Sequence, residues 1–110
     1  MSHFVPFALP IPDPPVAGAR VAFVLHGILG NHTNWRSVAR RLQEALPGWQ
    51  LHLVDHRSHG QSGPAPGPQT LEACGKDLAA LAARTGAPEV VLGHSFGGKV
   101  ALAYAATRPA

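Results

Sequence analysis

The sequence predicts an α/β fold, in which the strands of a parallel sheet alternate with helices along the chain. Three observations point to this class. Short, continuous apolar runs are each followed by a stretch with helical spacing, each run ends in a turn of glycine or polar residues, and this unit occurs three times. Strands and helices that alternate in this way form parallel sheets with right-handed crossovers, and helices on both faces give a three-layer α/β/α arrangement.

Length and composition limit the kinds of function. A chain of 110 residues, 45% of them hydrophobic and 14% charged, can bury one modest core, and its apolar runs are too short to span a bilayer. The formal net charge is +3, but the basic residues are scattered and no nucleic-acid-binding motif is present. We therefore expect neither a nucleic-acid partner nor a membrane span, and the sequence carries no signal for an oligomeric state.

Two further features bear on localisation and cofactors. Cys74 is the only cysteine, which excludes an internal disulfide and fits a reducing compartment. The N-terminus has no basic segment followed by a continuous apolar segment. We therefore expect no secretory signal and an intracellular protein, either cytoplasmic or in an organelle such as a plastid or mitochondrion. No phosphate-binding or dinucleotide-binding fingerprint is present, and we expect no cofactor.

The first part of the chain is expected to contain a lead-in, a strand and a helix. Residues 1–19 are predicted to form an extended, proline-rich lead-in without periodicity. Arg20 to Gly27 is a continuous apolar run that ends at a glycine, which is typical of a strand buried on both faces. From Asn34 to the pair Pro47-Gly48, apolar residues recur at three- and four-residue spacing, which predicts an amphipathic helix.

The second part is expected to add two strands and two helices. The next strand is predicted at Gln50 to His56, followed by a polar, proline-rich loop. Thr70 is expected to cap a helix whose apolar residues share one face and which ends at Gly86. A third short strand is predicted at Glu89 to Gly93, and a third helix from about Phe96 to Thr107.

Polar residues follow each of the three predicted strands. His26 and Gly27 follow the first strand, Asp55 the second and Ser95 the third. In open parallel sheets, ligands bind beyond the carboxyl ends of the strands. We therefore expect these residues to meet at one edge of the sheet.

The segment from Gly93 to Gly97 has the pattern Gly-x-Ser-x-Gly between a strand and a helix. A nucleophilic serine in this position occupies a sharp, strained turn, and glycines two residues before and after it relieve the crowding. Ser95 is then exposed above the sheet as the candidate nucleophile, with the amide of Phe96 as one oxyanion donor. The alternative is a glycine-rich turn whose serine has no chemical role.

The segment HGILGN begins at His26, directly after the first predicted strand. Its glycines would bring the backbone close to a substrate carbonyl. The amide of Ile28 is our candidate for the second oxyanion donor. The alternative is an ordinary turn between a strand and a helix.

Three segments in this order resemble the signature segments of the α/β-hydrolase superfamily: HGILGN, DHRSHGQS and GHSFGGKVAL. The resemblance is strongest to its compact serine esterases, the branch of abhydrolase domain-containing protein 11, with plant and algal members nearest. It spans about Val16 to Pro109. It implies that residues 20–110 form the N-terminal half of an α/β-hydrolase domain, which is incomplete by itself.

The resemblance also implies roles for individual residues. Ser95 would be the nucleophile, and Ile28 and Phe96 the backbone oxyanion donors. The residues expected to support them structurally are His26, Gly27, Gly93, His94, Gly97 and Asp55. The loop after the second strand would be fixed by Asp55, Arg57, His59 and Ser62. His56 departs from the family pattern, in which a small or apolar residue is usual, and this departure bears on local packing.

Metal binding is the weaker interpretation of the histidines. His52, His56 and His59 are spaced like possible ligands. Even spacing along a strand does not make side chains converge, however, and we expect structural or solvated roles and no metal.

The residues after Ser95 include no Asp, Glu or His, although the superfamily's triad runs Ser, Asp or Glu, then His. We expect the acid and the base to lie beyond residue 110. A rearranged triad that uses His26 or His94 with Asp55 is conceivable. The predicted function is hydrolysis of small-molecule carboxylic esters or thioesters, and acyl transfer to an alcohol remains open. The alternative is a truncated, inert hydrolase-like chain or a binding or regulatory module.

Overall fold

The structure, a computed structural model, describes residues 4–28 and 30–107. Residues 1–3 of the predicted lead-in, Leu29 of the segment HGILGN and residues 108–110 lie outside the described residues. The elements in this part of the chain, with two 3₁₀ helices named η, are β1 (Ala8–Ile11), β2 (Arg20–Leu25), η1 (His32–Trp35), α1 (Arg36–Ala45), β3 (Trp49–Val54), η2 (Gly60–Ser62), α2 (Leu71–Thr85), β4 (Val90–Gly93) and α3 (Phe96–Ala106).

The strands form one sheet in the order β1-β3-β2-β4. β2 pairs in parallel with both β3 and β4, as the alternation of strands and helices predicted. β1 pairs antiparallel with β3, so the sheet is mixed and the prediction of a wholly parallel sheet is wrong in this respect. β1 has only four residues, one of them Pro10, and lies at the edge of the sheet, where proline is tolerated because no further strand needs its missing amide. A strand of four residues is too short to show an alternation of apolar and polar residues in the sequence.

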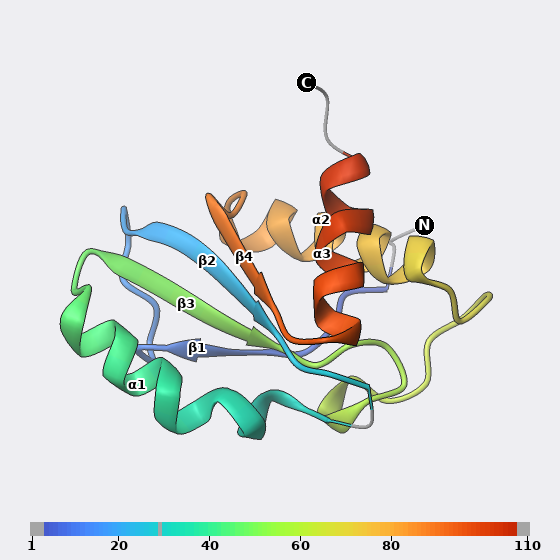
Figure 1. The fold of residues 1–110 in the computed structure, drawn as a ribbon. Coiled ribbons are helices and arrows are strands. Elements are labelled where there is room, and N and C mark those ends of the chain that lie inside the picture. The colour runs from blue at the N-terminus through green and yellow to red at the C-terminus, as the bar shows by residue number, and fades with distance from the viewer. Residues whose placement is uncertain (1–3, 29, 108–110) are drawn as a thin grey trace.

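Helices cover both faces of the sheet, which confirms the three-layer arrangement. Figure 1 shows α1 on one side and α2 with α3 on the other. Alternate residues of β2 point to opposite faces: Phe23 and Leu25 pack with α2 and α3, whereas Ala22 and Val24 pack with α1. All four side chains are buried, and full burial of a side chain as large as leucine contributes about 1.5–3 kcal/mol. This two-sided burial explains the continuous apolar run.

Side-chain caps mark the starts of α2 and η1, whereas α1 and α3 begin without one. The hydroxyl of Thr70 accepts a hydrogen bond from the amide of Ala73 at 3.0 Å, so this predicted cap of α2 is confirmed. The first helix was predicted from Asn34, but α1 begins two residues later. Asn31 caps η1 instead: its side chain accepts from the amide of Thr33 at 2.9 Å, and this short 3₁₀ turn takes up the intervening residues.

The β4 edge of the sheet is exposed. On the side away from β2, β4 has no neighbouring strand within residues 4–28 and 30–107. Val90 and Leu92 are 39% and 40% exposed there, and Leu102 of α3 is 73% exposed. No helix in the described part of the chain is both long and apolar enough to cross a membrane.

Candidate active site

Three turns leave the sheet at the same level. In the register of the two parallel pairs, Leu25 at the end of β2 lies opposite Val54, the last residue of β3, and opposite Gly93, the last residue of β4. The segments that follow these strands therefore start side by side at one edge of the sheet. The structure brings the predicted site residues together there, as the rule for parallel strands led us to expect.

The turn after β4 forces Ser95 into an unusual backbone conformation. Ser95 has φ 54° and ψ −113°, a combination rare for residues other than glycine, and its side chain is exposed. A Cβ atom on Gly97 would stand 2.6 Å from the carbonyl oxygen of Leu25 and 2.7 Å from that of His26. A Cβ atom on Gly93 would collide with the backbone of Gly97. Close backbone packing is therefore the physical reason for both glycines.

The two candidate oxyanion donors lie on the turns that flank Ser95. Phe96 is the first residue of α3, and Ile28 lies in the turn after β2 with its side chain 63% exposed. Within the described residues, neither amide donates a hydrogen bond to another protein group. For Phe96 this follows from its place in the first turn of a helix, whose amides lack intrahelical acceptors. Both amides are thus available to a ligand.

Asp55 joins the turn after β3 to the segment after β2. Its carboxylate is fully buried and accepts hydrogen bonds from the amide and from Nδ1 of His32, at 2.5 and 2.9–3.0 Å. The amide of Gln61 donates to Oδ2 at 2.8 Å. Both carboxylate oxygens are therefore engaged, which favours the structural role over that of a triad acid. Sequence reasoning missed His32, because 23 residues separate it from Asp55 and no local pattern joins them.

Two hydrogen bonds of opposite direction join His26 and His56. The amide of His56 donates to Nε2 of His26 at 3.2 Å, and Nε2 of His56 donates to the carbonyl oxygen of His26 at 3.1 Å. Since Nε2 of His26 accepts, its proton is assigned to Nδ1, which lies 2.5 Å from the carbonyl oxygen of Gly27. With both ring nitrogens engaged, His26 is a poor candidate for the general base of a rearranged triad.

Burial keeps this pair neutral. It lowers the pKa of His26 below its ordinary value, and burial together with the neighbouring His26 lowers the pKa of His56 to about 4. The ring of His56 lies 4.3 Å from that of His26 and 5.3 Å from that of Phe96, centroid to centroid. His56 therefore fills the space between His26 and the first residue of α3, Phe96.

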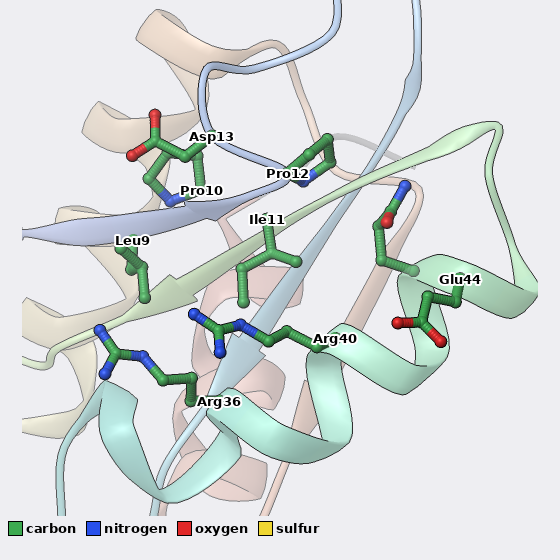
Figure 2. Close-up of a pocket in the computed structure, with 9 residues that line it drawn as sticks. Leu9, Pro10, Ile11, Pro12, Asp13, Arg36, Arg40 and Glu44 are labelled. Atoms are coloured by element: carbon green, nitrogen blue, oxygen red, sulfur yellow. The ribbon is translucent and has the colours of Figure 1, made fainter.

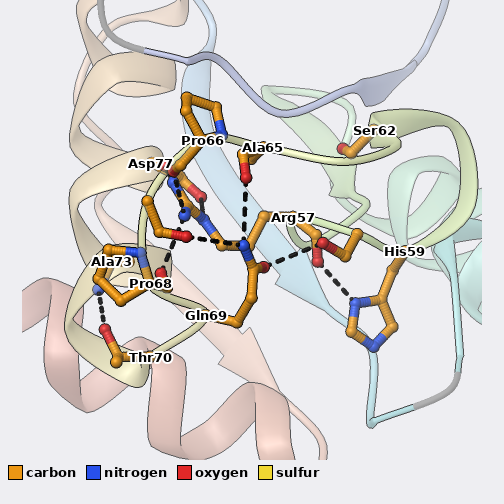
Figure 3. Close-up of polar contacts among 12 residues, drawn as sticks. Arg57, His59, Ser62, Ala65, Pro66, Pro68, Gln69, Thr70, Ala73 and Asp77 are labelled. Carbon is orange, nitrogen blue, oxygen red and sulfur yellow. Dashed lines mark hydrogen bonds and ion pairs between the residues drawn. The ribbon is translucent and has the colours of Figure 1, made fainter.

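Arg57 and Asp77 form a buried, two-pronged ion pair. Nε and Nη2 of Arg57 donate to the two carboxylate oxygens of Asp77 at 2.6 and 2.8 Å, and hydrogen bonding to Asp77 raises the pKa of Arg57. Nη1 donates to the carbonyl oxygens of Pro66 and Pro68, so one guanidinium fixes the loop against α2 (Figure 3). The expectation that Arg57 fixes this loop is met, but its partner Asp77 was not anticipated.

Ser62 ties the same loop to the N-terminal segment. Its hydroxyl donates to the carbonyl oxygen of Asp55 at 2.5 Å and accepts from the amide of Phe7 at 2.8 Å. Nδ1 of His59 lies 2.9 Å from the carbonyl oxygen of Arg57, a contact also drawn in Figure 3. The loop is thus fixed by the residues that the family resemblance implied.

A hollow of about 380 Å³ opens beside the turn after β2. It is lined by Gly27, Ile28, Gly30, Asn34, Trp35, Val38 and His94. Because most of these side chains are apolar and the hollow begins at a candidate oxyanion donor, it is suited to the apolar part of a small substrate. His94 is exposed and contributes one wall.

Another hollow, of about 440 Å³, lies away from these turns. Figure 2 shows it between β1 and α1, with Arg36 and Arg40 reaching from the helix toward Leu9 and Ile11 of the strand. No residue of the turns after β2, β3 or β4 lines it. We therefore do not assign it to the active site.

The histidines in the described part of the chain show no arrangement for a metal. Within the described residues, no group of three or more His, Cys, Asp and Glu side chains is placed to hold a metal ion. His52 instead packs edge-on against Phe23 at 6.0 Å between ring centroids, and burial lowers its pKa.

Comparison with known proteins agrees with this geometry. The model of the alpha/beta hydrolase fold family matches residues 23–110. A mouse protein named sn-1-specific diacylglycerol lipase ABHD11 is 40% identical over 86 residues, which are 77% of this chain and 27% of the mouse protein. Lipase LipV of Mycobacterium tuberculosis is 41% identical over 96 residues, covering 86% of this chain and 34% of the lipase. A probable alcohol acetyltransferase of Saccharomyces cerevisiae is 33% identical over 102 residues, 89% of this chain and 28% of that protein.

A solved structure shows the same fold. The chain superposes on a marine microorganism esterase with a TM-score of 0.77 and 28% identity, covering 94% of this chain and 37% of the esterase. The sheet and its three turns have the α/β-hydrolase fold, and the chain belongs to the alpha/beta hydrolase fold family, with lipases and an esterase among its relatives. It spans about a quarter to a third of the length of the curated relatives it matches.

Proposed function

We propose that this protein is a serine hydrolase that acts on small-molecule carboxylic esters or thioesters. The observation that carries the proposal is the conformation of Ser95, an exposed serine held at φ 54° by glycine packing at the carboxyl end of β4. A strained, exposed serine between a strand and a helix is the position of the nucleophile in α/β hydrolases. The lipases and the esterase among the relatives support the same chemistry.

The reaction would proceed in two steps. Oγ of Ser95 attacks the substrate carbonyl carbon while a general base takes its proton, and the carbonyl electron pair moves to the oxygen. The amides of Ile28 and Phe96 stabilise this oxyanion, and such a donor typically contributes about 10²–10³ in rate. The alcohol or thiol leaves with a proton, and water then releases the acyl group by the same route. We propose that an acid and a histidine base beyond residue 110 complete the triad.

The test is covalent labelling of the full-length gene product with a fluorophosphonate, together with hydrolysis of 4-nitrophenyl butyrate. We expect wild-type protein to be labelled and active, and Ser95→Ala to lose both. Ser58→Ala is the matched control, because Ser58 is also an exposed serine with positive φ, at 63°. Labelling that survives in Ser95→Ala, or that is lost equally in Ser58→Ala, would refute the assignment of Ser95. A wild-type protein without labelling or hydrolysis would instead favour the inert or regulatory module.

Acyl transfer to an alcohol is the second candidate function. The yeast relative named as a probable alcohol acetyltransferase favours it, since the chemistry up to the acyl-serine is shared. Hydrolysis of the butyrate ester in the presence of increasing ethanol separates the two. A transferase forms ethyl butyrate at the expense of butyrate, whereas a hydrolase releases butyrate at an unchanged proportion.

A further inference from the structure

His56 contacts both turns that carry the candidate oxyanion donors. On one side, Nε2 of its imidazole donates to the carbonyl oxygen of His26 at 3.1 Å, and its amide donates to the ring of His26 at 3.2 Å. Two bonds in opposite directions between the same residues fix position and orientation together. His26 lies only two residues before Ile28, so this contact reaches the base of the turn that carries the first donor.

On the other side, the same imidazole packs against the residue that carries the second donor. Its ring stands perpendicular to that of Phe96, with centroids 5.3 Å apart, and His59 stacks on Phe96 at 6.3 Å. Edge-to-face pairs of this kind contribute about 0.5–1.5 kcal/mol beyond simple burial. His56 is 2% exposed, so its ring is confined between the two turns.

The separation of the two turns matters for the proposed reaction. Two amides can share one oxyanion only if each lies about 2.7–3.1 Å from the place where the charge develops. Strand register sets where the turns begin, but the donors lie three residues beyond each strand end, at Ile28 after Leu25 and at Phe96 after Gly93. A side chain that bridges the turns can therefore determine the distance between the donors.

We propose that His56 is a positioning residue for the hydrolase reaction, an inference that rests on the function proposed above. Its imidazole holds the turn at Ile28 and the first residue of α3, Phe96, at the separation that lets both amides bind the same oxygen. His56 itself does not touch the substrate. Its effect is confined to the transition state, in which the oxyanion exists.

The protonation state of the imidazole suits this role. Burial and the adjacent His26 lower the pKa of His56 to about 4, so the ring is neutral at pH 7 and donates only from Nε2. The titratable groups that face it are His26, His59 and Asp55. A neutral imidazole keeps the donor bond to His26 without adding a charge beneath the oxyanion.

Three substitutions of His56 separate hydrogen bonding from filling of space. His56→Gln keeps an N–H donor at the reach of Nε2, whereas His56→Asn carries the same amide on a shorter side chain that falls short of His26. His56→Phe keeps the ring and removes the donor. The matched control is His52→Phe, which removes another buried imidazole from the same part of the chain, one that packs on Phe23 and not on the turns.

The experiment measures kcat and KM for 4-nitrophenyl butyrate, and Ki for an alkyl trifluoromethyl ketone that forms a tetrahedral adduct with serine, all with the full-length gene product. We expect His56→Asn and His56→Phe to lower kcat about tenfold, with KM within about twofold. Ki should rise by the factor by which kcat/KM falls, because the adduct carries the oxyanion. His56→Gln and His52→Phe should stay within about threefold of wild type.

Two results would overturn the proposal. One is wild-type kcat in His56→Phe and His56→Asn, and the other is a loss in His56→Gln as large as in His56→Asn, which would indicate general destabilisation. If His56→Phe does not fold, the Gln and Asn pair decides alone, since the two amides differ only in reach. If the wild-type protein does not hydrolyse the ester, both the proposed function and this inference are refuted. If the wild-type protein is active and substitutions of His56 do not change kcat, only this inference is refuted.

Discussion

The turns after β3 and β4 start at the same level of the sheet but are held in place by different means. After β4, close backbone packing fixes the turn itself: a Cβ atom on Gly97 would stand 2.6 Å from the carbonyl oxygen of Leu25 and 2.7 Å from that of His26. After β3, hydrogen bonds made by side chains fix the loop. Asp55, His56 and Arg57 follow one another, all are buried, and each is hydrogen-bonded to a different part of the chain.

The two turns therefore differ in where their stabilising contacts come from: neighbouring residues for one, and distant parts of the chain for the other. The turn at Ser95 is specified by five consecutive residues, Gly93 to Gly97. The first and the last of these must be glycine, because a Cβ atom at either position would collide with the backbone. The loop after β3 depends on partners elsewhere in the chain, and removal of one partner leaves a buried polar group or charge unsatisfied. We therefore expect the largest losses of stability from the loop, although the chemistry is proposed for the turn at Ser95.

The largest effect is expected from the ion pair. Asp77→Ala should lower the free energy of unfolding by about 3–5 kcal/mol, because it leaves the buried guanidinium of Arg57 without its carboxylate. Glu72→Ala removes a carboxylate from the same helix, but one that is exposed and 3.9 Å from Lys76, and should change stability by less than about 0.5 kcal/mol. Denaturant unfolding of both variants measures the difference. Equal losses would mean that the loop does not depend on this pair.

The second-largest loss of stability is expected on acidification, through the histidines that contact the loop. The pKa of His56 is about 4 when folded, against an ordinary value of 6.5, so the unfolded chain binds more protons between these values. Stability is therefore complete above about pH 6.5 and falls as the pH decreases toward 4, by on the order of 3 kcal/mol for His56. The lowered pKa of His26 adds to the loss in the same direction. Unfolding measured from pH 8 to 4 should show a shallower slope in His56→Phe than in wild type.

A smaller effect is expected at the turn of Ser95. Gly97→Ala should cost about 2 kcal/mol, since its methyl group would press on the carbonyl oxygens of Leu25 and His26. Gly98→Ala is the matched control: its methyl group would find only an ordinary contact, 3.6 Å from the carbonyl oxygen of Gly93, and alanine favours the helix. We expect Gly98→Ala to be neutral or up to about 1 kcal/mol more stable. A destabilised Gly98→Ala with unaffected Gly97→Ala would reverse our account of this turn.

The same contrast explains which features the sequence could predict. The β2 run, the Thr70 cap and the turn at Ser95 are local patterns, and the structure contains all of them. The pairing of Asp55 with His32 and of Arg57 with Asp77 joins residues 23 and 20 positions apart. No spacing rule connects such partners, because the fold brings them together only after the strands and helices have packed. β1 was missed for a related reason, since its pairing with β3 spans the chain from Ala8 to Val54.

The smallest effect tests whether β1 belongs to the loop's network. Ser62→Ala removes one hydroxyl that bridges the amide of Phe7 and the carbonyl oxygen of Asp55, and each lost hydrogen bond of this kind contributes about 0.5–1.5 kcal/mol. Both bonds are only partly buried, so we expect a combined loss near the lower end for two bonds, about 1 kcal/mol, with faster amide hydrogen exchange in β1 but not in β4. Ser37→Ala, an exposed serine on α1, should leave both unchanged. If exchange in β1 is unaffected by Ser62→Ala, antiparallel pairing with β3 alone holds the first strand, and the side-chain network ends at the loop.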